Sequence, residues 1–152
     1  MAVSDGVSIA DEVRAAIAAY ARALDDGRTE VVVDLFHPDG VVDIAGVGIF
    51  AGHEAIRGAY SGFTPRHPQL HLVSNTLVTY GIDDVVTATS DLVFLACGRS
   101  GWAVRAVGRY DDVLSHRDGA WRFDRRTATF RDRAPAETGD AVGQGAPQAG
   151  GG

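Results

Sequence analysis

Lysine is absent from this chain, and its 14 basic residues are all arginine. The absence excludes a lysine Schiff base, a lysine general base and the phosphate-binding lysine of a P-loop. A single cysteine, Cys97, excludes an internal disulfide and a metal site built from several cysteines. Any reaction must therefore depend on His, Asp, Glu, Tyr, Ser or Cys97.

Basic charge and long apolar runs are also scarce. The formal net charge is -6 and the pI is near 5.2, which argues against nucleic acid or an anionic membrane surface as a partner. No apolar run approaches the ~20 residues that span a bilayer. Residues 1–6 lack the basic and apolar stretches of a secretory signal. We therefore expect a cytoplasmic protein.

The order of apolar and turn residues predicts helices first and long strands afterwards. Ser8 caps a helix whose apolar residues recur at helical spacing until about Asp26, where Gly27 ends it. Residues 38–40 (Pro-Asp-Gly) predict a turn. Further helices are expected at 30–36 and 52–60, and strands at 41–44, 49–50, 71–80, 85–97, 102–114 and 120–130.

This order of elements is typical of the α+β class. Short connections between the long strands favour antiparallel hairpins. A curved, mostly antiparallel sheet wrapped around the N-terminal helices would form a cone with a small-molecule pocket at its open end. We expect a flexible leader at 1–7, one domain at 8–133 and a disordered tail at 134–152, where Gly, Ala, Pro and Gln dominate.

Asp25 and His71 form the pair with the clearest chemical use. Helical spacing places Asp25 beside the apolar stripe of the first helix and turns Asp26 toward solvent. A carboxylate at the C-terminal end of a helix interacts unfavourably with the helix dipole. This small cost favours a functional role for Asp25. A carboxylate that orients an imidazole makes a general base that works near neutral pH.

Other interpretations of these residues stay open. Asp25 could be a surface acid, and His71 a core or rim residue of its strand. His67 and His71 could bind a metal together with Asp25, although the nearby prolines preclude the helix of an HExxH motif. We predict no metal site. The remaining histidines, His37, His53 and His116, lie beside turn signals and are expected to be solvated.

Several residues are candidates for substrate binding. Tyr20, Tyr60, Tyr110 and Trp102 could line a pocket, or could be ordinary core. Arg125 and Arg126 lie on opposite faces of the last strand, so one should point inward and could hold an anionic or carbonyl oxygen. The alternative for either arginine is an ion pair with one of three acids, Asp43, Asp91 or Asp124.

At this level of detail the chain resembles SnoaL-like proteins of the nuclear-transport-factor-2-like superfamily. The resemblance rests on six segments in order: YARALDDG at 20–27, LFHPDG at 35–40, FAGHEAI at 50–56, HLVSN at 71–75, GRYDD at 108–112 and DGAWRF at 118–123. It covers about residues 8–130. It implies a cone-shaped fold with a deep apolar pocket, and it leaves the reaction open because members range from polyketide cyclases to non-catalytic proteins.

Within the superfamily, the branch of scytalone dehydratase and hexachlorocyclohexane dehydrochlorinase uses an Asp–His dyad. The resemblance places that dyad on Asp25 and His71. Two departures exclude a transfer of either substrate: Ala96 stands near the second pocket histidine of the dehydratase, and Tyr20 replaces a lysine of the dehydrochlorinase. The pocket arginine of the dehydrochlorinase falls on Arg126.

These observations predict a cofactor-independent lyase, isomerase or cyclase that acts on an apolar or polycyclic small molecule. His71 would remove a proton from carbon, and Tyr20, Tyr110 or Arg126 would stabilise the developing oxyanion. The alternatives are a non-catalytic binding protein and an accessory subunit of a larger enzyme. Trp102 and Val104 could form that contact, or equally the contact of a homodimer. We expect the protein to be a homo-oligomer, either a dimer or a trimer.

Overall fold

Three helices and two short strands precede four long strands in the computed structural model, which describes residues 7–133. The predicted tail, and the predicted leader apart from Val7, lie outside the described residues. The α+β class predicted from the sequence is confirmed. The elements are α1 (Ile9–Asp25), α2 (Thr29–Asp34), β1 (Phe36–Ile44), β2 (Gly48–Ala51), α3 (Gly52–Ser61), β3 (Gln69–Tyr80), β4 (Val85–Gly98), β5 (Gly101–Arg117) and β6 (Ala120–Arg133).

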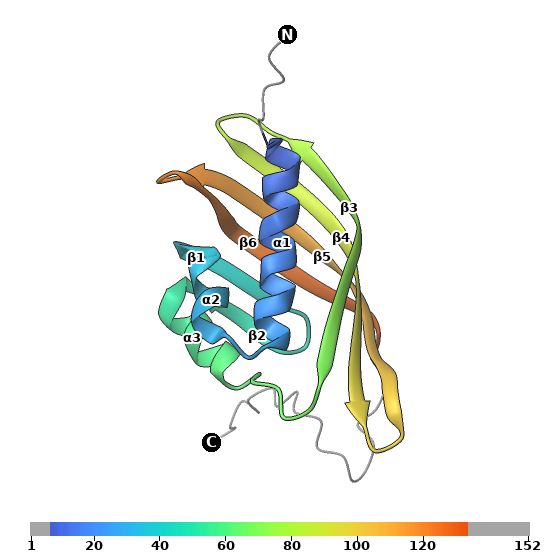
Figure 1. Cartoon of the computed structure of the whole chain (residues 1–152). Helices are drawn as coiled ribbons and strands as arrows, with labels where there is room; N and C mark the ends of the chain where they lie inside the picture. The colour runs from blue at the N-terminus through green and yellow to red at the C-terminus, as the bar shows by residue number, and fades with distance from the viewer. Residues whose placement is uncertain (1–6, 134–152) are drawn as a thin grey trace.

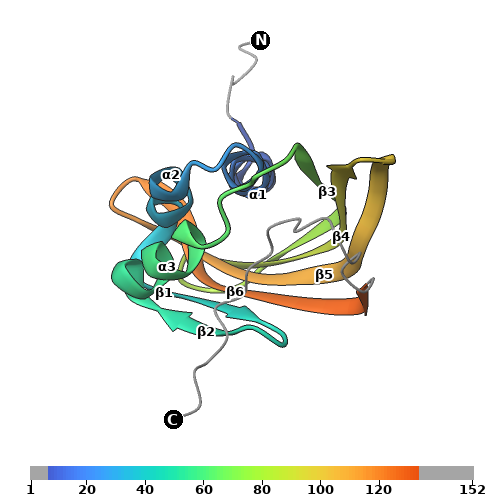
Figure 2. The same ribbon diagram turned by 90° about the horizontal axis from the view of Figure 1, so that it is seen from below.

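The strands form one curved sheet in the order β2-β1-β6-β5-β4-β3. All neighbours are antiparallel except β1 and β6, which are parallel. Within the described part of the chain the sheet does not close, and β2 and β3 are its edges. The three helices lie on its concave side, with α1 across the long strands and α3 near β1 (Figures 1 and 2). The predicted curved, mostly antiparallel sheet is confirmed.

Helix α1 forms for the reasons that the sequence suggests. The Ser8 side chain accepts a hydrogen bond from the Asp11 backbone N–H, and acidic residues in the first turn favour the helix dipole. Gly27, at φ +66°, ends the helix in the left-handed conformation. The apolar stripe buries six residues against the sheet: Val13, Ala16, Ile17, Tyr20, Ala21 and Ala23.

Several predicted boundaries were wrong: β3 begins at Gln69 and not at 71, β6 ends at Arg133 and not at 130, and three further differences have a clear cause. Pro38-Asp39-Gly40 lies within β1 and not in a turn, because the register shift between Phe36 and Val41 absorbs a proline that cannot donate to the ladder. The second helix ends at Asp34 and not at Phe36, which begins β1. The last hairpin turns tightly at Asp118 and Gly119, both at positive φ, so β5 continues to Arg117.

The core fills the space between the helices and the concave face. Its largest buried aromatic residues come from separate elements: Tyr20 from α1, Phe36 from β1, Tyr60 from α3, Tyr110 from β5 and Phe123 from β6. Four of these rings pack edge-on around Tyr20, with centroids about 6 Å from it. This arrangement fixes α1 over β5 and β6.

Gly108 provides a direct test of how closely β5 and β6 approach. A Cβ at this position would lie 2.2 Å from the Thr129 carbonyl oxygen. We expect Gly108→Ala to lower the free energy of unfolding by about 1–3 kcal/mol, because the strand must shift to admit the methyl group. Chemical denaturation would measure the change. Gly58→Ala on α3, where a Cβ meets nothing within 4 Å, is the control and should stabilise slightly; equal effects would contradict the packing.

Candidate active site

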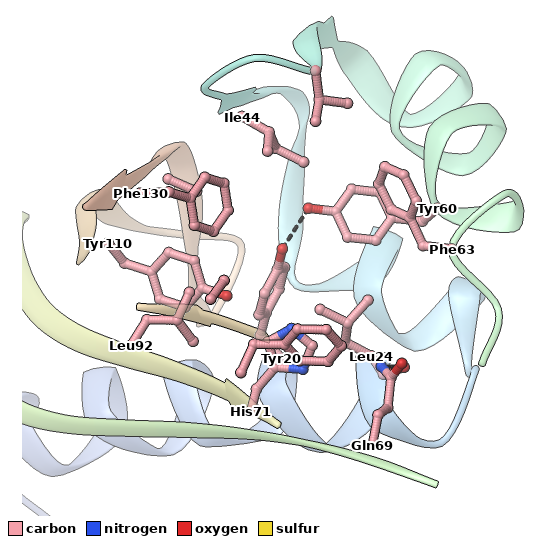
Figure 3. A pocket seen from close by; sticks show the side chains of 14 residues that line it. Tyr20, Leu24, Ile44, Tyr60, Phe63, Gln69, His71, Leu92, Tyr110 and Phe130 are labelled. Atoms are coloured by element: carbon pink, nitrogen blue, oxygen red, sulfur yellow. Dashed lines mark hydrogen bonds between the residues drawn. The ribbon is translucent and has the colours of Figure 1, made fainter. Parts of the chain in front are cut away.

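A cavity lies between α1, α3 and the concave face of the sheet (Figure 3). The volume open to the centre of a water molecule is about 60 Å³, several times the ~10–15 Å³ that one water requires. Its lining contains three tyrosines, one histidine, one glutamine and nine apolar residues: Tyr20, Tyr60, Tyr110, His71, Gln69, Leu24, Ile44, Val47, Phe63, Leu92, Phe94, Ala106, Ala128 and Phe130. Among the described residues, no Asp, Glu or Arg lines it.

Asp25 and His71 are in contact at one end of this cavity. The His71 Nδ1 lies 2.6 Å from Asp25 Oδ1, and the His71 backbone N–H donates to Oδ2 at 2.8 Å. The two side chains are only 6% and 10% exposed, with the imidazole the less exposed. Asp26, by contrast, faces solvent and pairs with Arg28. The predicted contact between the two side chains is therefore present.

The contact determines how the imidazole can act. One carboxylate holds both the backbone and the ring of His71, and the ring also stacks on Phe94 with centroids 4.5 Å apart. A carboxylate accepts hydrogen bonds, so Nδ1 must carry a proton. In neutral His71 the lone pair is then on Nε2, at the opposite edge of the ring.

Gln69 supports the carboxylate from the start of β3. Its side-chain amide donates to Asp25 Oδ1 at 3.3 Å and to the Leu24 carbonyl at 3.4 Å. It ties the end of α1 to β3 beside the dyad. The sequence interpretation missed Gln69; its parity with His71 on the strand was a signal that could have identified it.

Three tyrosyl hydroxyls face the cavity from three elements. The hydroxyls of Tyr20 and Tyr60 hydrogen-bond to each other, and that of Tyr110 lies across the cavity (Figure 3). Tyr20 and Tyr110 are thus placed where substrate binding was predicted. Tyr60 was only a possible lining residue in the sequence, because nothing in its helical spacing separates a pocket tyrosine from a core tyrosine.

Burial keeps these tyrosines protonated. It raises the pKa of Tyr20, Tyr60 and Tyr110, and the nearby Arg126 guanidinium opposes the rise without cancelling it. At neutral pH all three are hydrogen-bond donors and not bases. Proton abstraction at this site would therefore depend on His71.

Arg126 does not reach the cavity. It points inward from β6, but its side chain is fully buried behind the tyrosines and makes a bidentate ion pair with Asp112 at 2.7 and 2.8 Å. The three acids considered in the sequence did not include this partner. Arg125 points outward and pairs with Asp43, one of those three.

Trp102 also lies away from the cavity. It is 55% exposed on the outer face of the sheet, where Val104 is exposed as well. The structure contains one copy of the chain, so the expected homo-oligomer stays a prediction.

The histidines outside the dyad have other roles. His37 is buried and its Nε2 contacts the Ser115 carbonyl and hydroxyl, so its predicted solvation was wrong; the extension of β1 through Pro38 draws it into the core. His53 is half-buried against the Phe36 carbonyl, whereas His116 is exposed, as predicted. His67 is exposed, and residues 7–133 contain no cluster of three or more His, Cys, Asp or Glu able to hold a metal ion.

The match to a family model decides the relationship of this chain to known proteins. A model of the SnoaL-like domain matches residues 7–127. The chain belongs to this family. The resemblance predicted from the six sequence segments is therefore confirmed, as is the nuclear-transport-factor-2-like fold. Comparison with curated proteins finds no match, and within 7–133 no helix has the length and apolar character of a membrane span.

Solved structures of several proteins are similar to this SnoaL-like chain. A function-unknown protein from Mycobacterium tuberculosis has 24% identity, a TM-score of 0.75, and coverage of 86% of this chain and 79% of its own. A putative scytalone dehydratase from Novosphingobium aromaticivorans has 21% identity and a TM-score of 0.72, and the match covers 81% of this chain and 84% of that protein. A Catenulispora acidiphila protein in complex with S-DNPA has 27% identity and a TM-score of 0.72, and the match covers 80% of this chain and 92% of that protein. The first two share the fold alone at these identities.

The raised pKa values of the tyrosines predict how stability depends on pH. A buried tyrosine that ionises above its ordinary pKa of 10.0 stabilises the folded state fully below pH 10 and loses that contribution as the pH rises further. We expect the free energy of unfolding to fall steeply above pH 10, and less steeply in Tyr110→Phe. Denaturation at graded pH would measure both slopes, and equal slopes in the two proteins would contradict the assignment.

Proposed function

We propose that this SnoaL-like protein is a cofactor-independent lyase, isomerase or cyclase in which Asp25 and His71 act as a general base dyad. The observation that carries the proposal is the 2.6 Å contact between Asp25 Oδ1 and His71 Nδ1 at the wall of a cavity to which residues 7–133 contribute no Asp, Glu or Arg. A neutral imidazole with a free Nε2 in such a cavity has no charged competitor for a proton from substrate.

The proposed step is proton abstraction from carbon. The Nε2 lone pair takes a proton from the carbon next to a carbonyl group, and the electron pair of that C–H bond moves to the carbonyl oxygen as an enolate. The imidazolium that forms is stabilised by the Asp25 carboxylate. Dehydration, double-bond migration and aldol-type ring closure all proceed through this step and differ in what leaves or adds next.

Tyr20, Tyr60 and Tyr110 are proposed to bind the enolate oxygen. Since Tyr20 and Tyr60 share one hydrogen bond, one of the two keeps its own proton for a ligand, and the Tyr110 hydroxyl makes no hydrogen bond to another described residue. Hydroxyl donors in a dry cavity stabilise charge that develops in the transition state. Apart from the tyrosines, His71 and Gln69, the described lining is apolar, which favours an apolar or polycyclic substrate with few oxygens.

The comparisons support this class without selecting a reaction. One structural neighbour is a putative scytalone dehydratase and another is the β subunit of a putative aromatic-ring-hydroxylating dioxygenase, both from Novosphingobium aromaticivorans. The second name keeps an accessory role as the alternative. In that case the exposed outer face around Trp102 and Val104 would contact the larger enzyme, and the dyad would have no catalytic use.

Deuterium exchange tests the proposed base without knowledge of the substrate. We expect the protein to accelerate exchange of the α-protons of 2-tetralone, a small apolar ketone, in deuterated water, followed by NMR. His71→Ala should lower the rate by about 10²-fold or more, because a positioned base contributes ~10²–10⁴-fold. Asp25→Asn should lower it as well, since the amide no longer requires a proton on Nδ1.

The control is His116→Ala. His116 is exposed, packs at an angle against Trp121 and does not line the cavity, so its loss should leave the exchange rate unchanged. Binding of 2-tetralone without exchange in the wild type would favour the non-catalytic binding protein. Equal exchange by wild type and His71→Ala would eliminate His71 as the base.

A further inference from the structure

A buried ion pair lies directly behind two of the cavity tyrosines. Asp112 on β5 and Arg126 on β6 are opposite each other in the sheet register, and both side chains are fully buried. Two hydrogen bonds join them, from Arg126 Nε to Oδ1 and from Nη2 to Oδ2. Neither residue lines the cavity. A buried charged pair adds little stability compared with apolar residues of the same size, so its presence calls for another explanation.

The guanidinium is enclosed by aromatic rings. Its central carbon lies 4.1 Å from the ring centroid of Tyr20, 4.0 Å from that of Tyr110 and 4.4 Å from that of Phe123. Its third nitrogen, Nη1, is buried and has no hydrogen-bond partner among the described residues. The cation therefore contacts the faces of the two tyrosines whose hydroxyls lie at the cavity.

The pair is oriented, and its two charges do not cancel at the tyrosines. The guanidinium lies against the rings, while the carboxylate lies on its far side, held by Nε and Nη2. For both Tyr20 and Tyr110, the effect of Arg126 in lowering the pKa exceeds the effect of Asp112 in raising it. The positively charged end of the buried ion pair therefore faces the cavity, and the rings of Tyr20 and Tyr110 lie between the two.

We propose that the Arg126–Asp112 pair is a positioning element that makes the Tyr20 and Tyr110 hydroxyls a binding site for an oxyanion, so that the site selects ligands which bind as an enolate or a phenolate. Arg126 acts through the tyrosines and does not touch the ligand. The inference rests on the proposed function, because it specifies the negative charge of the intermediate that the proposed reaction would form. Oxyanion binding itself does not require His71 to abstract a proton.

Phenols of similar size and increasing acidity are the probes. We expect their affinity for the wild type, measured by calorimetry at one pH, to rise with acidity, and their absorption spectra to show a phenolate band on binding. In Arg126→Met/Asp112→Leu, which removes both charges and fills the site with apolar side chains, the most acidic phenol should bind about tenfold more weakly while the least acidic one is unaffected. A purely structural role would change all the affinities equally.

Asp112→Asn provides the opposite change. It removes the negative charge and keeps one hydrogen bond to Arg126, so the dependence of affinity on acidity should steepen. The control is Arg125→Met/Asp43→Leu. It removes the ion pair between Arg125, which precedes Arg126 on β6 and points outward, and Asp43 on β1. The phenol series should bind to this control as it binds to the wild type.

The outcomes separate this inference from the proposed function. Wild-type affinities that do not depend on phenol acidity would overturn the oxyanion site, whether or not the variants fold, and so would an unchanged dependence in both Arg126–Asp112 variants. Loss of deuterium exchange in His71→Ala with the phenol dependence intact would support both proposals. An intact phenol dependence without any exchange by the wild type would support the oxyanion site and reject the base.

Discussion

The hydrogen bond between Asp25 and His71 is the interaction on which the site depends. It joins the last residue of α1 to the third residue of β3, two points 46 positions apart in the chain. Because Oδ2 of the same carboxylate also accepts the His71 backbone N–H, the strand itself is held at that point as well as the ring. The curvature of the sheet and the length of α1 matter to the chemistry because they bring these two ends together.

Burial divides the polar groups of the site into three roles. His71 lies at the cavity wall with one nitrogen committed to Asp25. The tyrosines are buried deeply enough that their pKa values rise, so they keep their protons and donate. Arg126 and Asp112 lie deeper still, where their charges are paired and the guanidinium lies against the rings of Tyr20 and Tyr110. In this account each group has the protonation state that its role requires.

Much of this arrangement could be predicted from periodicity. The helical spacing of α1 correctly separated Asp25 from Asp26, and strand parity correctly required one of Arg125 and Arg126 to point inward, although it did not say which. Contacts between distant elements were not accessible in the same way. Nothing local to Asp112 identified it as the partner of Arg126, because the pairing follows from the register of β5 and β6.

The errors at residues 36–40, including the expected solvation of His37, have a shared physical origin in β1. Pro38 and Gly40 are turn-forming residues, and the expectation of a turn there led to a solvated His37. In the structure a register shift carries the strand through the proline, and His37 is buried against Ser115. Tertiary pairing with β6 outweighed the local preference of these residues for a turn.

The most direct test of the account is the protonation of the His71 ring, observed by NMR of its two ring nitrogens in uniformly ¹⁵N-labelled protein at neutral pH. The account predicts a neutral ring with the proton on Nδ1 and an unprotonated Nε2, and loss of this single form in Asp25→Asn. A proton on Nε2, or a mixture of both neutral forms in the wild type, would show that Asp25 does not orient the imidazole and would contradict the account.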